Sequence, residues 1–229
     1  MWAIVPVKRL AEAKQRLSAL LSTEQRAALG LAMLEDVLAA LSGVAALDGI
    51  LLVSPDPRAH ALGRRYGARI LVEAENHGLN PAVQRAAALL QAEGVAQILV
   101  LHGDLPLVTE QEISRLIAAH RLTPALTPAL TIAPDAQGRG TNAMICSPPD
   151  LVDFHYGPDS VRAHCAAAEQ AGVVPTLLRA EGLGFDIDEV GDLLALTAHP
   201  ATTCTRKWLS GQPLAAMQAA CTQEKAGVS

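Results

Sequence analysis

The chain has 229 residues, of which 50% are hydrophobic, and a formal net charge of -5 at pH 7. This apolar content is enough to bury a large core, and the length fits one domain over residues 1–229 whose end frays after about residue 212. Aromatic residues make up only 3% of the chain. General nucleic-acid binding needs a basic surface or stacked aromatic rings, so this class of protein is excluded.

The rest of the composition predicts a cytoplasmic protein. No apolar run reaches the roughly 18 residues that a membrane span requires, and Lys8 and Arg9 follow only a short apolar start, so we expect neither a signal peptide nor membrane binding. The four cysteines form no CxxC pair and the seven histidines no known ligand pattern. A zinc or other transition-metal site is therefore not expected.

In the first half of the chain, strands alternate with helices. Capping boxes at Ser22/Gln25 and Thr109/Glu112 and an Asn80-Pro81 start indicate three helices, and a fourth begins at about residue 58. The apolar runs predict strands at 2–7, 50–53, 69–72 and 97–101. This alternation is typical of a parallel sheet with helices on both faces.

The second half is less regular. Its apolar runs predict strands at 129–133, 143–146, 173–178 and 183–187, and a helix begins near Asp159. Three prolines fall within 123–134, which we interpret as a loop that enters an added strand and not as a domain boundary.

Ligands of an open parallel sheet bind beyond the carboxyl ends of its strands, so residues that directly follow strands are the first candidates for a site. Asp104 follows the clearest of these strands, at 97–101, and a carboxylate there can hold Mg²⁺ together with water and phosphate oxygens. The alternative is that Asp104 only forms a turn before Pro106. A second carboxylate and phosphate-binding groups would favour the metal.

Asp186 and Asp188 supply such carboxylates. They lie two residues apart on a predicted short strand, and therefore on the same side of the pleat. Asp188 could instead cap a helix that starts at Glu189, and the two roles are compatible.

A basic loop after the first strand offers cations to a triphosphate. Four basic residues fall within nine positions, namely Lys8, Arg9, Lys14 and Arg16. A solvated helix face would also explain them, and the P-loop pattern GxxxxGK[ST] is missing, which argues against a Walker-type kinase or ATPase.

Two further segments combine glycines with hydroxyl groups. Residues 138–142 read GRGTN and residues 154–160 read FHYGPDS, which allow close backbone approach and hydrogen bonds to an anion. A hairpin turn and a helix cap are the alternative interpretations.

Taken in order, these segments resemble the 2-phospho-L-lactate guanylyltransferase family of coenzyme F-420 biosynthesis, which includes phosphoenolpyruvate and 3-phospho-D-glycerate guanylyltransferases. The resemblance rests on IVPVKRLAEAKQRL at 4–17, LSTEQRAALGLAMLEDVL at 21–38, GLNPAVQRA at 78–86, GDLPL at 103–107, GRGTNAM at 138–144, FHYGPDS at 154–160 and DIDEVGDL at 186–193. It implies an α/β fold with a Rossmann-like, mixed and mainly parallel sheet of the nucleotide-diphospho-sugar transferase (glycosyltransferase type A) kind.

The resemblance also implies roles for individual residues. Mg²⁺ would be held by Asp104 and Asp188 with Asp186, Asp188 ranking before Asp186. Catalysis would rest on Asp104, Asp188 and Lys14. GTP would be bound by Lys8, Lys14, Arg16, Gly78 and Asn80, and the phosphorylated acid by Thr141, Gly157 and Ser160.

The chain departs from the family pattern at two places. Residues 186–192 read DIDEVGD where the family usually reads D-x-D-T-P-E-D, so the threonine and proline that stiffen the helix start are missing. Arg139 replaces a common glycine beside the acid site.

The implied reaction transfers GMP from GTP to a phosphorylated three-carbon acid and releases pyrophosphate. Phosphoenolpyruvate, 3-phospho-D-glycerate and 2-phospho-L-lactate stay open as acceptors. The alanine-rich composition suggests a GC-rich bacterial genome, for which the resemblance to the family implies one of the first two. A cytidylyl- or guanylyltransferase acting on a sugar phosphate or pterin cofactor is one alternative, and a non-catalytic nucleotide-binding interaction protein is another. The expected partners are GTP, the acid, a second copy of the chain as a homodimer, and the next pathway enzyme, to which the unstable product would be handed over.

Overall fold

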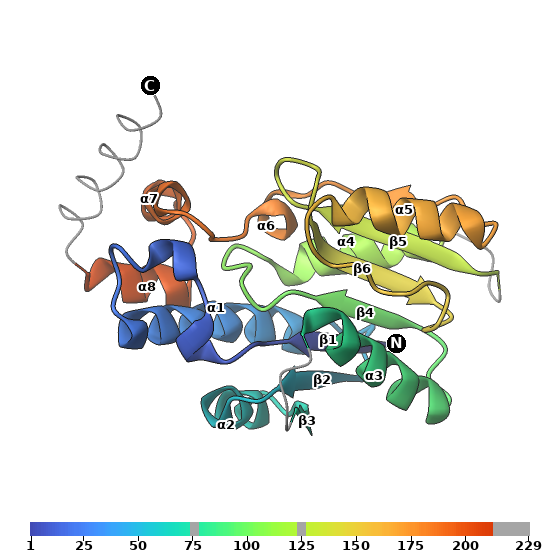
Figure 1. Ribbon diagram of the computed structural model, residues 1–229, viewed down its shortest axis with the longest axis horizontal. Coiled ribbons are helices and arrows are strands. Elements are labelled where there is room, and N and C mark those ends of the chain that lie inside the picture. Colours follow the sequence, from blue (N-terminus) through green and yellow to red (C-terminus); the bar gives the residue numbers. More distant parts are fainter. Residues whose placement is uncertain (74–77, 123–126, 213–229) are drawn as a thin grey trace.

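The protein is built on one seven-stranded sheet in the computed structural model, which describes residues 1–73, 78–122 and 127–212 (Figure 1). Across the sheet the strands run in the order β3 (Arg69–Val72), β2 (Gly49–Ser54), β1 (Trp2–Pro6), β4 (Ile98–Leu101), β6 (Thr141–Ser147), β5 (Ala129–Pro134) and β7 (Thr176–Leu177). Strand β6 is antiparallel to both of its neighbours, and the other pairs are parallel. The predicted mixed, mainly parallel sheet is thus confirmed.

Helices cover both faces of the sheet. On one face, α1 (Thr23–Gly43), α2 (Pro57–Arg65) and α4 (Glu110–His120) pack against alternate residues of the central strands. On the other face, α3 (Leu79–Ala92) and α5 (Ser160–Gln170) pack against the residues in between. This two-faced burial explains why the central strands are continuous apolar runs.

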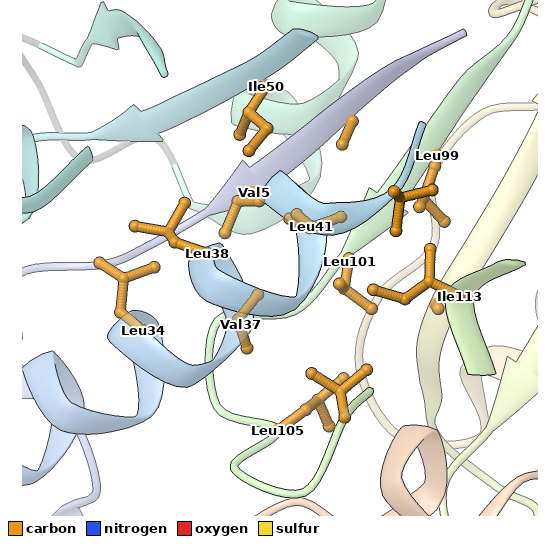
Figure 2. Packing of buried hydrophobic residues seen from close by; sticks show 14 of the residues in the cluster. Val5, Leu34, Val37, Leu38, Leu41, Ile50, Leu99, Leu101, Leu105 and Ile113 are labelled. Atoms are coloured by element: carbon orange, nitrogen blue, oxygen red, sulfur yellow. The ribbon is translucent and has the colours of Figure 1, made fainter. Parts of the chain in front are cut away.

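The first of these cores lies between α1, α4 and the two central strands (Figure 2). Val5 of β1 and Leu101 of β4 contact a row of leucines along α1, and all of them are buried. Truncating one such leucine to alanine typically costs about 2–5 kcal/mol. This core holds β1 and β4 in register, and the carboxyl ends of these two strands carry the candidate site.

A third core joins the segment after β1 to the C-terminal helices. That segment forms two short 3-10 turns, η1 (Leu10–Glu12) and η2 (Gln15–Leu17). Leu17 packs with Leu193 of α7 (Val190–Ala198) and with Leu209 of α8 (Cys204–Ser210). In Figure 1, α7 and α8 accordingly lie beside α1 at one end of the molecule.

Both predicted capping boxes are present, at Ser22/Gln25 and Thr109/Glu112. The predicted Asn80 cap is wrong, because α3 starts at Leu79 with Gly78 as its N-cap, at φ 92°. The expected fraying after about residue 212 and the start of the proline-rich loop, 123–126, lie outside the described residues.

The predicted strand 183–187 is also wrong. A helical turn, α6 (Glu181–Gly184), takes its place, and an extended segment without strand pairing follows. The Gly182 N–H donates to Glu112 Oε1 of α4 at 2.8 Å, and the Leu183 carbonyl accepts from Asn142 Nδ2 of β6 at 3.1 Å, so side chains hold this turn against α4 and the sheet without strand pairing. The predicted strand 173–178 shortens to the two residues of β7, which pair with Thr131 and Ile132 of β5, and the Leu178 N–H continues this contact with a bond to the Ile132 carbonyl at 2.9 Å.

Within the described ranges, no helix has both the length and the apolar character needed to cross a membrane.

Candidate active site

The candidate site lies at the carboxyl ends of β1 and β4. The chain order reverses between these strands, because β2 and β3 extend the sheet on one side and β4 on the other. A crevice is expected at such a switch point. A cavity of about 290 Å³ is present there, with polar lining by Lys8, Lys14, His102, Asp104 and Asp188.

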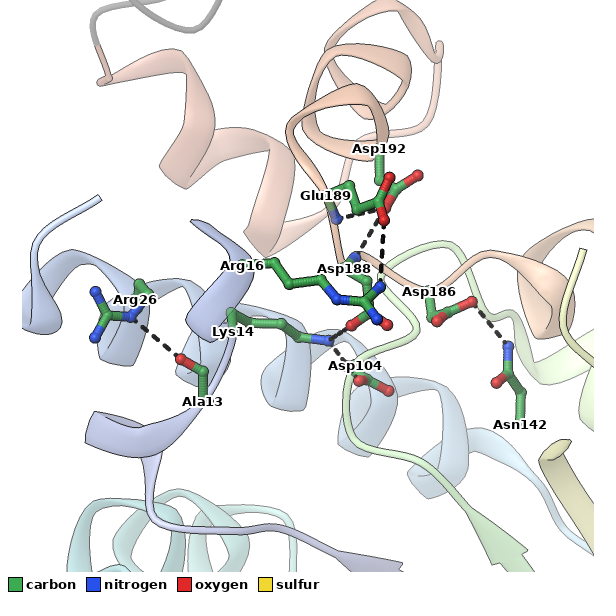
Figure 3. A network of polar contacts seen from close by, with 10 residues as sticks. All are labelled: Ala13, Lys14, Arg16, Arg26, Asp104, Asn142, Asp186, Asp188, Glu189 and Asp192. Atoms are coloured by element: carbon green, nitrogen blue, oxygen red, sulfur yellow. Dashed lines mark hydrogen bonds and ion pairs between the residues drawn. The ribbon is translucent and has the colours of Figure 1, made fainter. Parts of the chain in front are cut away.

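Lys14 connects the two sides of this cavity. Its Nζ lies 2.6 Å from Asp104 Oδ2 and 3.0 Å from Asp188 Oδ1 (Figure 3). Burial alone would lower the pKa of Lys14, but the two carboxylates raise it above its ordinary value. Lys14 is therefore an ammonium ion at neutral pH, held between two anions.

The backbone around Lys14 is held in place as well. Lys14 has a left-handed conformation, φ 51° and ψ 47°, which L-residues rarely adopt. The buried Arg26 guanidinium donates to the carbonyl of Ala13 at 3.2 Å and to the carbonyl of Leu21 at 2.9 Å. These bonds tie the loop to the start of α1 and direct the Lys14 side chain at the carboxylates.

One carboxylate oxygen of Asp104 has no hydrogen-bond partner. Burial tends to raise its pKa, but the neighbouring Lys14 ammonium brings the pKa below its ordinary value, so the carboxylate is ionised. Its Oδ2 accepts from Lys14, whereas its Oδ1 is buried without a hydrogen-bond partner. An unsatisfied buried acceptor is unfavourable unless a ligand completes it.

Asp186 and Asp188 do not lie on a strand as predicted, and of the two only Asp188 lines the cavity. Asp186 Oδ1 accepts from Asn142 Nδ2 at 3.3 Å, and burial, followed by the nearby Asp104, raises the pKa of Asp186 to about 6. The predicted Asp188 cap is wrong: Glu189 is the N-cap of α7 and forms a capping box with Asp192. The Asp188 carboxylate is therefore available to face Lys14.

These carboxylates fit a hard divalent cation. Lys14 Nζ shows that one cation reaches both Asp104 and Asp188, and Asp104 Oδ1 offers a further lone pair. In the described part of the chain no ready cage of three or more His, Cys, Asp or Glu side chains is formed. Mg²⁺ needs none, since it is usually held by one or two carboxylates with waters and phosphate oxygens.

The other residues predicted to bind the nucleotide lie around this cluster. Lys8 is exposed at the cavity, while Arg16 is exposed and pairs with Glu189 at 3.2 Å. Asn80 exchanges two hydrogen bonds with the backbone of Tyr156, 2.7 Å to its N–H and 3.1 Å to its carbonyl. Gly78 is the N-cap of α3 and directly precedes the cavity-lining Leu79.

The residues predicted to bind the acid form a second group. The Thr141 N–H donates to Ser160 Oγ at 2.8 Å, and both residues are buried. Thr141 follows a hairpin turn between β5 and β6, as the alternative interpretation of the GRGTN segment predicted. Gly157 is exposed at φ 146°, just before α5.

Sequence reasoning missed three neighbours of these groups. His102 lines the cavity, Asn142 holds Asp186, and His164 bonds to Thr141. His102 directly precedes the GDLPL segment and Asn142 lies within GRGTNAM, so their position in the motifs was a usable signal. His164 gave none, because it lies in the middle of a helix.

Solved structures of other proteins share this fold. A protein from Desulfovibrio desulfuricans G20 described as a nucleotide-diphospho-sugar transferase superposes with a TM-score of 0.73, at 14% identity, over 95% of this chain and 96% of that one. 4-Diphosphocytidyl-2C-methyl-D-erythritol synthase gives 0.57 at 18% identity, over 85% and 95%. The Mycobacterium tuberculosis glucosyl-3-phosphoglycerate synthase, solved with Mn²⁺ and uridine diphosphate, gives 0.53 at 12% identity, over 78% and 70%. The fold is that of the nucleotidyltransferases and nucleotide-diphospho-sugar transferases.

Comparison of the sequence with family models and curated proteins assigns the chain to one family. A model of the guanylyl transferase CofC like family matches residues 1–224, so the chain belongs to this family. Phosphoenolpyruvate guanylyltransferase of Sphaerobacter thermophilus is 37% identical over 197 residues, which is 86% of this chain and 92% of the relative. The enzyme of the same name from Roseiflexus sp. (strain RS-1) is 38% identical over 205 residues, 90% and 88%. The predicted guanylyltransferase family is confirmed.

Proposed function

We propose that this protein transfers GMP from GTP to phosphoenolpyruvate and releases pyrophosphate, in the cytoplasm, as a step of coenzyme F-420 biosynthesis. The observation that carries the proposal is the Asp104–Lys14–Asp188 cluster at the switch point of a CofC-like fold. The names of the relatives favour phosphoenolpyruvate over the other two acids.

The proposed reaction does not need a strong general base. The attacking group is the phosphate of the acid, which is already an anion at neutral pH. The chemical problem is to bring two polyanions together, and the cavity offers Lys8 and Lys14 for this purpose. In this proposal both ammonium groups hold the GTP phosphates, while Thr141, Gly157 and Ser160 hold the acid.

A divalent cation fits beside these residues. Asp104 and Asp188 would hold it, with Asp186 behind them. When bound, Mg²⁺ neutralises charge on the phosphates and on the departing pyrophosphate. Asp186 would contribute as an anion only above its raised pKa, and for this reason we rank it after Asp188.

The test is pyrophosphate release with GTP and each of the three acids. We expect the highest kcat/KM with phosphoenolpyruvate. A higher value with 3-phospho-D-glycerate or 2-phospho-L-lactate would overturn the acceptor assignment, and turnover with CTP but not GTP would favour a cytidylyltransferase. GTP binding without pyrophosphate release would favour a non-catalytic role.

Dimerisation and product hand-over also belong to this proposal. Light scattering of the purified chain checks the homodimer, and isotope trapping with the next pathway enzyme checks the hand-over.

A further inference from the structure

A buried histidine outside the cavity lining is bonded to the group of residues assigned to the acid. His164 lies on α5 and has no exposed surface. Its Nε2 lies 2.9 Å from the backbone N–H of His155, and its Nδ1 lies 3.0 Å from Thr141 Oγ1. Both ring nitrogens are thus used within the protein.

These two bonds leave only one arrangement of protons. A backbone N–H always donates, so Nε2 of His164 has to be the acceptor and carries no proton. In the neutral ring the proton then lies on Nδ1, and Nδ1–H donates to Thr141 Oγ1. The ring is neutral at pH 7, because burial and then the neighbouring His155 and His102 lower the pKa of His164 to about 4.

The same reasoning extends to the hydroxyl groups. Thr141 Oγ1 accepts from His164, so its own hydrogen is free to donate to another group. Ser160 Oγ accepts the Thr141 N–H at 2.8 Å, so its hydrogen is free as well. Both hydroxyls accept from the protein and keep a hydrogen with which they can donate to a ligand, and Ser160 opens an eleven-residue helix whose positive end favours an anion.

We propose that His164 is a positioning residue that fixes the Thr141 and Ser160 hydroxyls as a pair of hydrogen-bond donors for the phosphorylated acid. The inference rests on the proposed function, because it takes these hydroxyls as the acid site. His164 itself touches no substrate in this proposal. It acts through Thr141, whose N–H in turn orients Ser160.

The first test reads the proton directly and needs no substrate. Long-range ¹H–¹⁵N correlation spectra of the full chain at pH 7.5 show which ring nitrogen of each histidine is protonated, and the spectrum of His164→Asn assigns the His164 signal by its loss. We expect the proton on Nδ1. A proton on Nε2, or an imidazolium, would overturn the inference.

The second test separates positioning from structural support. In His164→Asn the side-chain amide nitrogen takes the place of Nδ1 and keeps a donor for Thr141, whereas His164→Gln reaches the place of Nε2 and loses that donor. A hydrogen bond to a charged group typically corresponds to about a tenfold to hundredfold change in equilibrium. We expect His164→Gln to raise KM for phosphoenolpyruvate by about tenfold or more, and His164→Asn by less than about threefold, with KM for GTP unchanged in both.

His120 provides a matched control. It is also buried between two hydroxyl groups, with Nδ1 2.9 Å from Thr131 Oγ1 and Nε2 2.7 Å from Ser147 Oγ, but it lies at the opposite end of β6. His120→Gln should leave both KM values unchanged. Equal KM increases for acid and GTP in His164→Gln, or equal effects of the Asn and Gln variants at position 164, would overturn the inference.

The two proposals fail in different ways. A chain that releases no pyrophosphate with any of the three acids overturns the proposed function, whatever the spectra show. Turnover that is normal in His164→Gln, or an Nε2–H tautomer in an active enzyme, overturns only the role of His164. Thermal melts by circular dichroism identify variants that do not fold. If a His164 variant does not fold, the ¹H–¹⁵N spectra of the unmodified protein alone test the proposed tautomer.

Discussion

The ion pair between Lys14 and Asp104 should be measurable as a coupling free energy. Nζ and Oδ2 are 2.6 Å apart, and the Lys14 side chain is only 7% exposed, against 30% for Asp104. A hydrogen bond between charged groups with this degree of burial contributes about 1.5–3 kcal/mol. Lys14→Met removes the cation and leaves the Asp104 carboxylate without its partner, so we expect a loss of about 3 kcal/mol of unfolding free energy at pH 7.5.

The loss should depend on whether Asp104 is charged. In the Asp104→Asn background no buried anion is left behind, and Lys14→Met should therefore cost about 1 kcal/mol or less. The four proteins of this double-mutant cycle are unfolded with urea, and the coupling is calculated from their free energies of unfolding. A coupling below about 0.5 kcal/mol would refute the electrostatic account of the pair.

The pH dependence gives an independent test of the same pair. The pKa of Asp104 is lower in the folded protein than in the unfolded chain, so its contribution to stability is present above the unfolded pKa and is lost as the pH falls through the folded pKa. Lys14→Met removes the cause of the lowering. The difference in stability between the two proteins should therefore shrink toward pH 3, and a difference that does not change with pH would indicate lost packing.

Three further predictions concern the segment that carries the aspartates. Asp188→Asn should remove most magnesium-dependent turnover and Asp186→Asn less of it, and the reverse ranking would exchange their roles. The pKa of Asp186 is raised to about 6 in the folded protein, so the ionised carboxylate destabilises the fold, and the parent loses stability as the pH rises through this value. In urea titrations Asp186→Asn should therefore be more stable than the parent above pH 6 and equal to it near pH 3. Gly182→Ala should cost about 3 kcal/mol or more in urea unfolding, because a Cβ there would overlap the Leu107 carbonyl.

The first half of the fold could be predicted from the sequence because its signals are local. Each strand is a short apolar run, and two helices begin with capping boxes that need only residues three positions apart. The segment 183–187 failed for the opposite reason. Leu183 and Ile187 are buried by packing that comes from distant parts of the chain, and an apolar run does not tell a strand from a buried turn and extended segment.

The sequence predicted which residues form the candidate site, but not how these residues contact one another. Asp104 stood out by its place after a strand, Asp188 as one of two aspartates two residues apart, and Lys14 as one of four basic residues in the loop after the first strand. Their meeting depends on the left-handed backbone of Lys14 and on a contact between residues 174 positions apart in the sequence. Neither feature has a local signature, since lysine is not a residue that marks a left-handed turn.

The hydrogen bonds of Asp104 and Asp188 support the proposed site over the two plain interpretations, a turn former and a helix cap. A turn-forming Asp104 would use its oxygens on nearby backbone N–H groups, yet Oδ1 is buried without a partner and Oδ2 is bonded to Lys14. A capping Asp188 would face the helix start, yet Glu189 and Asp192 do this instead. A buried acceptor without a partner costs about 1–3 kcal/mol, so folding alone gives no reason for this arrangement. In the proposed function a cation and the phosphates of a nucleotide would supply that reason, because they would complete the free oxygen of Asp104 and compete for the ammonium of Lys14.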